Sequence, residues 1–329
     1  MKLRQITLAL AIAGMASAAH SASLVKIDPD GPGPAPAMNN VFSLDWAPGN
    51  TLAVPVHPLT RAADVTVGSV LQTYSHARLR GFGDNFNVTI PAPGLDSAYE
   101  WTFVAAFQEQ FGFFSTSTPH FRVVPGGTNF FEIWVSPPNS SDLTGRGFSD
   151  GVRILAGTVL PFSGGVGMST FMPIIPAAPH IPNLDAFGIN NYPGVRSIRG
   201  SGGGSFVLSV TFSHPQYFLT PPTIVSANFD SMLNLPFNQA NPSSCFWNGG
   251  GYISGVGPIA GGHPDQCPIN TVGPINGMPT FLGGTGPNNL LFQDSSMSFV
   301  TMAVPEPATL ALVGLGLVGL GFSLRRRSA

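Results

Sequence analysis

The first pattern that could perform chemistry is a serine between two glycines. Gly147, Ser149 and Gly151 match the Gly-x-Ser-x-Gly motif of hydrolases, in which a strand precedes the serine and a helix follows it. Here residues 144–147 are rich in turn formers, and residues 152–155 have the apolar composition of a strand. The sequence therefore predicts a turn between strands at Ser149 rather than an exposed nucleophile.

The histidines and acidic residues form no recognisable catalytic or metal-binding pattern. His57, His214 and His263 each precede a proline, and no two histidines have the i, i+4 spacing of a zinc-binding helix. The segment Asp28–Gly31 is similar to the start of a calcium loop but lacks the downstream ligands. A hydrolase with an unrecognised site stays open as an alternative. We expect a protein that is not an enzyme and that has no cofactor or metal.

Cys245 and Cys267 are the two cysteines of the chain. In an exported protein an even number of cysteines indicates a disulfide, which would stabilise the folded state by roughly 3 kcal/mol in the chain-entropy model. A metal site that also uses His263 and a pair of free thiols are the alternatives.

Some aromatic residues could stack on the faces of sugar rings. Trp247 and Tyr252 flank the glycine-rich segment 248–251, inside the loop that the predicted disulfide closes. These two are the candidates for a carbohydrate site. Trp46 is a further candidate, whereas Trp101 and Trp134 lie in predicted strands and are expected in the core.

The two ends of the chain have the composition of targeting segments. Residues 1–18 combine Lys2 and Arg4, an apolar stretch and a small-residue cleavage site, which is typical of a secretory signal peptide. Residues 308–324 are uncharged and long enough to cross a thin membrane as a helix. Arg325, Arg326 and Arg327 follow at once and should stay cytoplasmic. The preceding chain is therefore expected to cross the inner membrane.

A proline-flanked carboxylate stands directly before this apolar segment. Val304, Pro305, Glu306 and Pro307 can neither continue a helix nor join a central strand, so they should form an extended, accessible segment. Together with the apolar segment and the terminal arginines, this sequence resembles the PEP-CTERM sorting signal. The resemblance implies processing by an exosortase in bacteria that make exopolysaccharide.

The body between the ends has the pattern of an all-β protein. Apolar residues alternate with polar or smaller ones in three segments, which predicts half-buried strands. Further strands are expected at 64–74, 84–90, 121–124, 152–160, 223–229 and 290–300. The alternating sets are Trp101, Phe103, Ala105 and Phe107; Phe131, Ile133 and Val135; and Phe206, Leu208, Val210 and Phe212. Because no helical periodicity interrupts them, we expect an antiparallel β-sandwich-like body with long loops rich in Gly and Pro.

Composition and charge restrict the classes of partner. Charged residues make up 9% of the chain, while 25 Phe residues argue against disorder. Once the basic residues of the two ends are set aside, nine basic residues face 16 acidic ones. Such an acidic body is a poor ligand for nucleic acid, which needs basic groups to neutralise its phosphates.

The predicted order of segments follows from these patterns. A signal peptide (1–18) is followed by a Pro/Gly linker (19–40), a β-rich secreted body (41–303) and the sorting signal (304–329). A long loop or a domain junction is expected at 161–204, where prolines are frequent.

A looser similarity links the body to PEP-CTERM proteins associated with flocculation. Residues 150–160, the late cysteine pair and residues 289–300 carry this resemblance. It implies a non-enzymatic protein of the cell surface or extracellular matrix, associated with exopolysaccharide in biofilms or flocs. A secreted carbohydrate-binding module is the alternative of a different class.

Overall fold

The computed structural model describes most of the chain between residues 25 and 303. The described residues are 25–56, 66–163 without 87 and 115–117, 167–173, 181–183, 193–197, 200–231, 240, 243, 245–249, 252–254, 257–258, 290–292 and 298–303. The predicted signal peptide, the segment 308–324, the sorting motif and Cys267 lie outside these residues. Within the described part of the chain, no helix is long and apolar enough to span a membrane.

All regular elements among the described residues are β-strands, and the pairings between them are antiparallel. The strands are β1 (Val25–Ile27), β2 (Met38–Val41), β3 (Ser43–Trp46), β4 (Asn50–Pro55), β5 (Val70–Gly83), β6 (Thr89–Ile90), β7 (Glu100–Phe114), β8 (Thr118–Val124), β9 (Phe130–Ser136), β10 (Val152–Val159), β11 (Met168–Pro173), β12 (Ile181–Asn183), β13 (Pro193–Ser197), β14 (Gly200–Ser213), β15 (Ile224–Ser231), β16 (Phe246–Trp247), β17 (Tyr252–Ser254), β18 (Gly257–Pro258), β19 (Leu290–Phe292) and β20 (Ser298–Ala303). The prediction of an antiparallel all-β body is confirmed.

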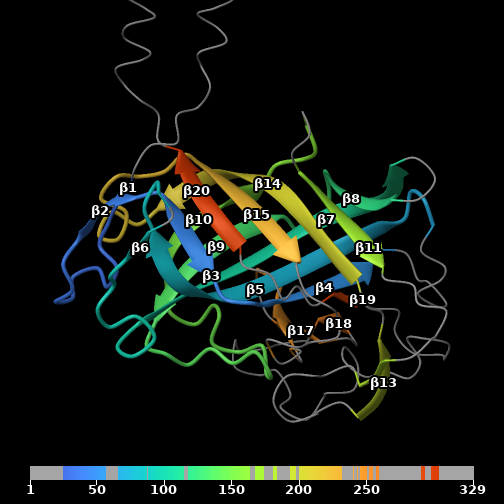
Figure 1. Cartoon of the computed structure of the whole chain (residues 1–329), viewed down its shortest axis with the longest axis horizontal. Helices are drawn as coiled ribbons and strands as arrows, with labels where there is room; N and C mark the ends of the chain where they lie inside the picture. Colours follow the sequence, from blue (N-terminus) through green and yellow to red (C-terminus); the bar gives the residue numbers. More distant parts are fainter. Residues whose placement is uncertain are drawn as a thin grey trace, which may run out of the picture.

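The main sheet has 13 strands and curls until it closes on itself (Figure 1). Its closed path runs through β3, β5, β7, β9, β10, β14, β15 and β20, and β20 pairs again with β3. This arrangement differs from the expected sandwich, which has two separate sheets. The difference arises because β5, β7 and β14 are 14 or 15 residues long, so each pairs with two different strands along one edge.

Most residues of the main hydrophobic core lie on strands of this closed path. Trp101, Phe103, Ala105 and Phe107 all belong to it, as their alternation predicted. Trp101 packs edge-on against Phe82, with ring centroids 5.1 Å apart. The predicted inward set on β9 is likewise buried, as are Phe206 and Leu208 on β14. Strand periodicity therefore identified most of the core.

The last residue of one predicted set behaves differently. Phe212 is 39% exposed, and the guanidinium carbon of Arg153 lies 5.6 Å from the centre of its ring. The pairing of β10 with β14 shifts here, because Ala156 faces Phe212 whereas Gly157 faces Val210. Such a bulge reverses the alternation of the bulged strand, so Phe212 no longer continues the inward face.

Part of the expected Pro/Gly linker is folded. Val25 and Ile27 on β1 and Met38 and Val41 on β2 are buried in the main core, and β1 pairs with β2. Residues 28–37 form the connection between these strands. The sequence pattern did not predict β1 and β2, because β1 is only three residues long.

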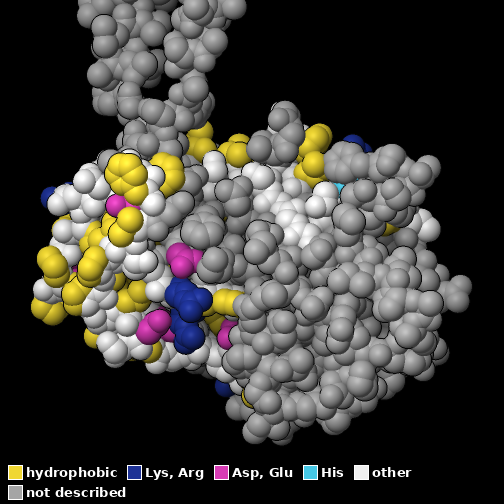
Figure 2. Space-filling model, viewed as in Figure 1, with side chains coloured by type: hydrophobic (Ala, Val, Ile, Leu, Met, Phe, Trp, Pro, Cys, Tyr) yellow, Lys and Arg dark blue, Asp and Glu magenta, His cyan; other side chains and the backbone are white. Residues whose placement is uncertain are grey.

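The surface carries few charges, in keeping with the composition. Figure 2 shows one cluster of basic and acidic side chains on the described part of this face. Hydrophobic side chains gather at the end that carries β1, β2 and β6, where Phe86 and Val88 are 78% and 59% exposed.

Candidate functional site

The two predicted sugar-stacking residues lie on one small hairpin. β16 pairs with β17, and the register places Trp247 directly opposite Tyr252. The neighbouring pair is Phe246 with Ile253. Trp247 is partly exposed, whereas Phe246 is fully buried. The hairpin therefore carries a buried anchor, Phe246, next to the partly exposed Trp247.

Phe246 fixes the hairpin to the sheet. Its side chain packs with Leu52, Tyr74 and Ala106 in a hydrophobic cluster separate from the main core. The aromatic ring of Phe246 also stacks on the imidazole of His76, with centroids 4.7 Å apart and 26° between the ring planes. Because Leu52, Tyr74 and Ala106 belong to β4, β5 and β7, the hairpin covers the outer side of these strands.

His76 is enclosed by groups from two other segments of the chain. The ring of Phe148 stacks on it with centroids 4.1 Å apart, and its Nε2 lies 2.8 Å from the hydroxyl of Ser243. The Ser243 hydroxyl in turn donates to the backbone carbonyl of Asp142. Burial lowers the pKa of His76 to about 3, so the imidazole is neutral at physiological pH. His76 and Ser243 are 1% and 0% exposed, so this pair joins two segments and is closed to substrate in this structure.

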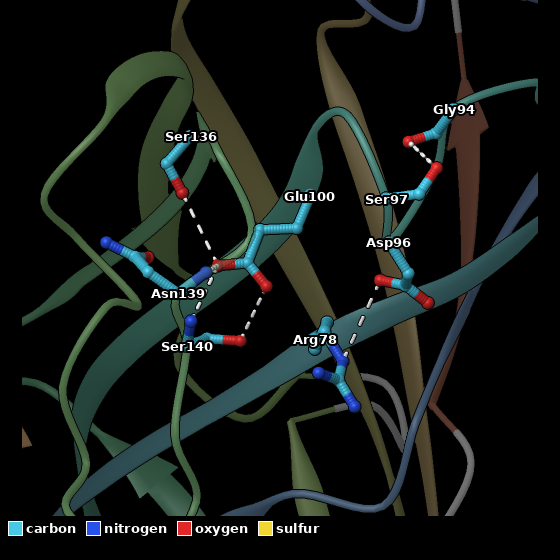
Figure 3. A network of polar contacts seen from close by, with 8 residues as sticks. All are labelled: Arg78, Gly94, Asp96, Ser97, Glu100, Ser136, Asn139 and Ser140. Atoms are coloured by element: carbon cyan, nitrogen blue, oxygen red, sulfur yellow. Dashed lines mark hydrogen bonds and ion pairs between the residues drawn. The ribbon is translucent and has the colours of Figure 1, made fainter.

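The segment 137–151 is held by a buried carboxylate. Glu100, 1% exposed, accepts hydrogen bonds from the backbone N–H groups of Asn139 at 2.8 Å and Ser140 at 2.7 Å. The Ser140 hydroxyl donates to the second carboxylate oxygen at 2.7 Å, and Figure 3 shows these side chains together with Ser136. Four donors around one carboxylate fix the start of this loop.

The fixed loop in turn supports the stem of the hairpin. Gly145 has a φ of +71°, and a Cβ atom there would lie 1.9 Å from the carbonyl oxygen of Cys245. Only glycine therefore allows this close approach.

The same loop carries a carboxyl group with a raised pKa. Burial raises the pKa of Asp142 to about 6; the charge of Arg78 opposes this rise and the charge of Glu100 adds to it.

The other sequence-based candidates have these positions. Ser149 is 5% exposed and lies between β9 and β10, as the prediction of a turn between strands required. Trp46 is fully buried, as is Trp101, while Trp134 is partly buried and donates from Nε1 to Glu132. Cys245 is fully buried; its pairing with Cys267 stays a prediction.

Sequence reasoning missed His76, Glu100 and Asp142. Their partners are distant in the sequence, 167 positions away for His76 and about 40 for Glu100. His76 and Glu100 lie on strands, and Asp142 lies in the loop between β9 and β10. A single sequence does not show whether such polar residues are buried or exposed to solvent. Within the described residues, no group of three or more His, Cys, Asp or Glu side chains could hold a metal ion.

The sorting signal follows the last strand directly. β20 lies between β15 and β3 in the sheet and ends at Ala303. Residues 303–327 match the PEP-CTERM protein-sorting motif. The chain carries a PEP-CTERM sorting signal. This match includes Val304–Pro307 and Arg325–Arg327 and implies processing by an exosortase and export. No curated protein and no solved structure matches the chain.

Proposed function

We propose that this chain is a non-enzymatic protein of the cell surface or extracellular matrix, released by an exosortase and associated with exopolysaccharide in biofilms or flocs. The PEP-CTERM match at residues 303–327 carries this proposal. The flocculation-associated resemblance of the body, at residues 150–160 and 289–300, supports the finer role.

The position of β20 in the sheet supports release of an intact body. β20 is an interior strand of the main sheet, paired on both sides, and its last residue is Ala303. Processing near Pro305–Pro307 would therefore leave every strand of the sheet in the mature chain. The released protein is expected to keep the fold described above.

The first and last strands of the described body both lie close to the segment that joins β2 to β3. Thr301 on β20 pairs with Ser43 on β3, and Val41, two residues before Ser43, pairs with Val25 on β1. Val25 and Ala303, the first and last of the described residues, therefore both lie near residues 41–43. This placement suits a protein whose two targeting segments both engage the same membrane during export.

Carbohydrate binding by the β16–β17 hairpin is the second candidate function. Residues directly opposite each other in an antiparallel pair share one face of the sheet, and the register makes Trp247 and Tyr252 such a pair. The rigid attachment of Phe246 would keep the pair in place before a sugar binds.

A complementation experiment tests the proposed role. A host strain without the chain should aggregate less, and the wild-type gene should restore aggregation. A variant with alanine at Pro305, Glu306 and Pro307 should fail to restore it, although the chain accumulates in the membrane fraction. Equal aggregation with and without the chain would contradict the surface or matrix role.

A further inference from the structure

Two carboxylates meet in the loop that follows β1. Burial, followed by the side chain and the charge of Asp30, raises the pKa of Asp28. In each of them the Oδ1 atom is buried and has no hydrogen-bond partner. Asp30 Oδ2 accepts a hydrogen bond from the backbone N–H of Ala35 at 2.9 Å. Two buried carboxylate oxygens in one loop are unfavourable unless a donor or a cation lies nearby.

A third unpaired oxygen belongs to a buried tyrosine. Tyr99 is 6% exposed, and its hydroxyl has no hydrogen-bond partner among the described residues. Burial, followed by the negative charges of Asp30 and Asp28 and then of Asp96, raises the pKa of Tyr99 to about 12. The hydroxyl therefore stays neutral, and the charges of both carboxylates act on it.

The backbone around these oxygens is fixed by contacts with the main sheet. Trp101 Nε1 donates to the carbonyl oxygen of Pro29 at 2.7 Å, and the N–H of Asp28 donates to the carbonyl oxygen of Tyr217 at 2.8 Å. Gly31, with a φ of +65°, lies against the ring of Tyr217, 2.7 Å from where its Cβ would be. The loop is thus held in place by bonds that leave the three oxygens unused.

We propose that Asp28, Asp30 and the Tyr99 hydroxyl bind a divalent cation of the Ca²⁺ type. Calcium takes six to eight oxygen ligands in flexible geometry and accepts carboxylates, backbone carbonyls and water together. A site with two carboxylates belongs to the weak class, with a Kd of about 10⁻⁴–10⁻³ M, which is typical of extracellular modules. The bound ion would hold the β1–β2 connection against the sheet.

Calorimetric titration of the full-length chain in mild detergent at pH 7.5 tests this site. After treatment with EDTA and desalting, CaCl₂ should bind with a Kd of about 0.1–1 mM, and MgCl₂ at least about tenfold more weakly because Mg²⁺ demands a rigid octahedral site. The midpoint of thermal unfolding should rise by about 2–4 °C in 5 mM CaCl₂.

Variants separate this site from the general charge of the protein. Asp30→Asn should weaken calcium binding at least about tenfold, and Tyr99→Phe, which removes one oxygen and keeps the ring, a few-fold. Asp150→Asn is the matched control, because Asp150 is exposed and contacts Asn139 instead; its affinity for calcium should equal that of the wild type.

Two results would overturn the proposal. One is a wild-type chain that shows neither binding heat nor a thermal shift with CaCl₂. The other is unchanged calcium affinity in Tyr99→Phe together with unchanged affinity in Asp30→Asn. If Asp30→Asn does not fold, the calcium affinity of Tyr99→Phe alone decides whether the proposal stands.

Discussion

The side chains of His76 and Ser243 are 2.8 Å apart, although 167 positions of the sequence separate them. This contact joins the middle of β5 to the residues that lead into the β16–β17 hairpin. Phe148 and Phe246 stack on either side of the imidazole, so the ring has no room for water. The attachment of the hairpin therefore requires that this imidazole is neutral.

Acid should loosen this attachment. The pKa of His76 is lowered by burial to about 3 in the folded state, against about 6.5 in the unfolded chain. The unfolded state therefore binds more protons between these values, so the stabilisation is complete above about pH 6.5 and is lost as the pH falls toward 3. The full effect amounts to as much as about 5 kcal/mol. Thermal unfolding between pH 8 and 4.5 measures the first part of this loss, about 2–3 kcal/mol.

The variant His76→Gln isolates this contribution. Asp142 acts in the opposite direction, because its raised folded pKa of about 6 gives stability at low pH that is lost as the pH rises through that value. A comparison of wild type with His76→Gln cancels Asp142 and the other carboxylates. The loss of stability between pH 8 and 4.5 should be clearly smaller in the variant, and equal losses in both chains would refute the role of His76.

Glu100→Gln should destabilise the segment 137–151. The amide keeps one acceptor oxygen but replaces the other by an N–H₂ group that faces donors from Asn139 and Ser140. Loss of charged hydrogen bonds and burial of an unpaired donor should lower the free energy of unfolding by about 2–3 kcal/mol. Limited proteolysis should show faster cleavage within 137–151.

Asp150→Asn is the control for this experiment. Asp150 accepts a hydrogen bond from the side chain of the same Asn139 at 2.7 Å, but it is exposed. Its substitution should change the free energy of unfolding by less than about 0.5 kcal/mol. Similar destabilisation by both variants would mean that the Glu100 hydrogen bonds contribute no more to stability than the exposed Asp150 hydrogen bond.

Trp247→Ala tests the carbohydrate-binding candidate. If the hairpin binds sugar, loss of this ring should weaken binding of the host's exopolysaccharide about tenfold, as expected for removal of an aromatic anchor. Phe86→Ala is the control, because Phe86 is a 78% exposed ring on the β5–β6 connection. Co-sedimentation with the purified polysaccharide measures both variants. Equal binding by Trp247→Ala and wild type would exclude the hairpin as a sugar site.

The sequence predicted strands best where one face is apolar and the other polar. The set Trp101, Phe103, Ala105 and Phe107 is an example, and its burial followed from alternation alone. Where both faces are buried, the pattern disappears. β5 is buried at most positions on both faces, and the predicted strand ended at Tyr74 although β5 continues to Gly83. Its polar residues Thr73, Ser75 and His76 are buried too, with His76 under the hairpin stem.

The closed sheet and the polar contacts depend on long-range pairing. The pairing of β3 with β20 joins Ser43 to Thr301, and no local pattern encodes such a register. The same holds for Glu100 and Ser140, or for His76 and Ser243. The sorting signal is different, because an enzyme recognises it as a short contiguous segment, so its residue types and order are sufficient for its prediction.

The most direct test of the proposed sorting is mass spectrometry of both termini of the native protein. The protein should be recovered separately from the membrane, surface-wash and culture-medium fractions of the host. Exosortase processing predicts a chain that starts near Ala19, ends near Pro305–Pro307 and is found outside the inner membrane. An intact end at Arg325–Ala329, found only in the inner membrane, would contradict release and with it the proposed matrix role.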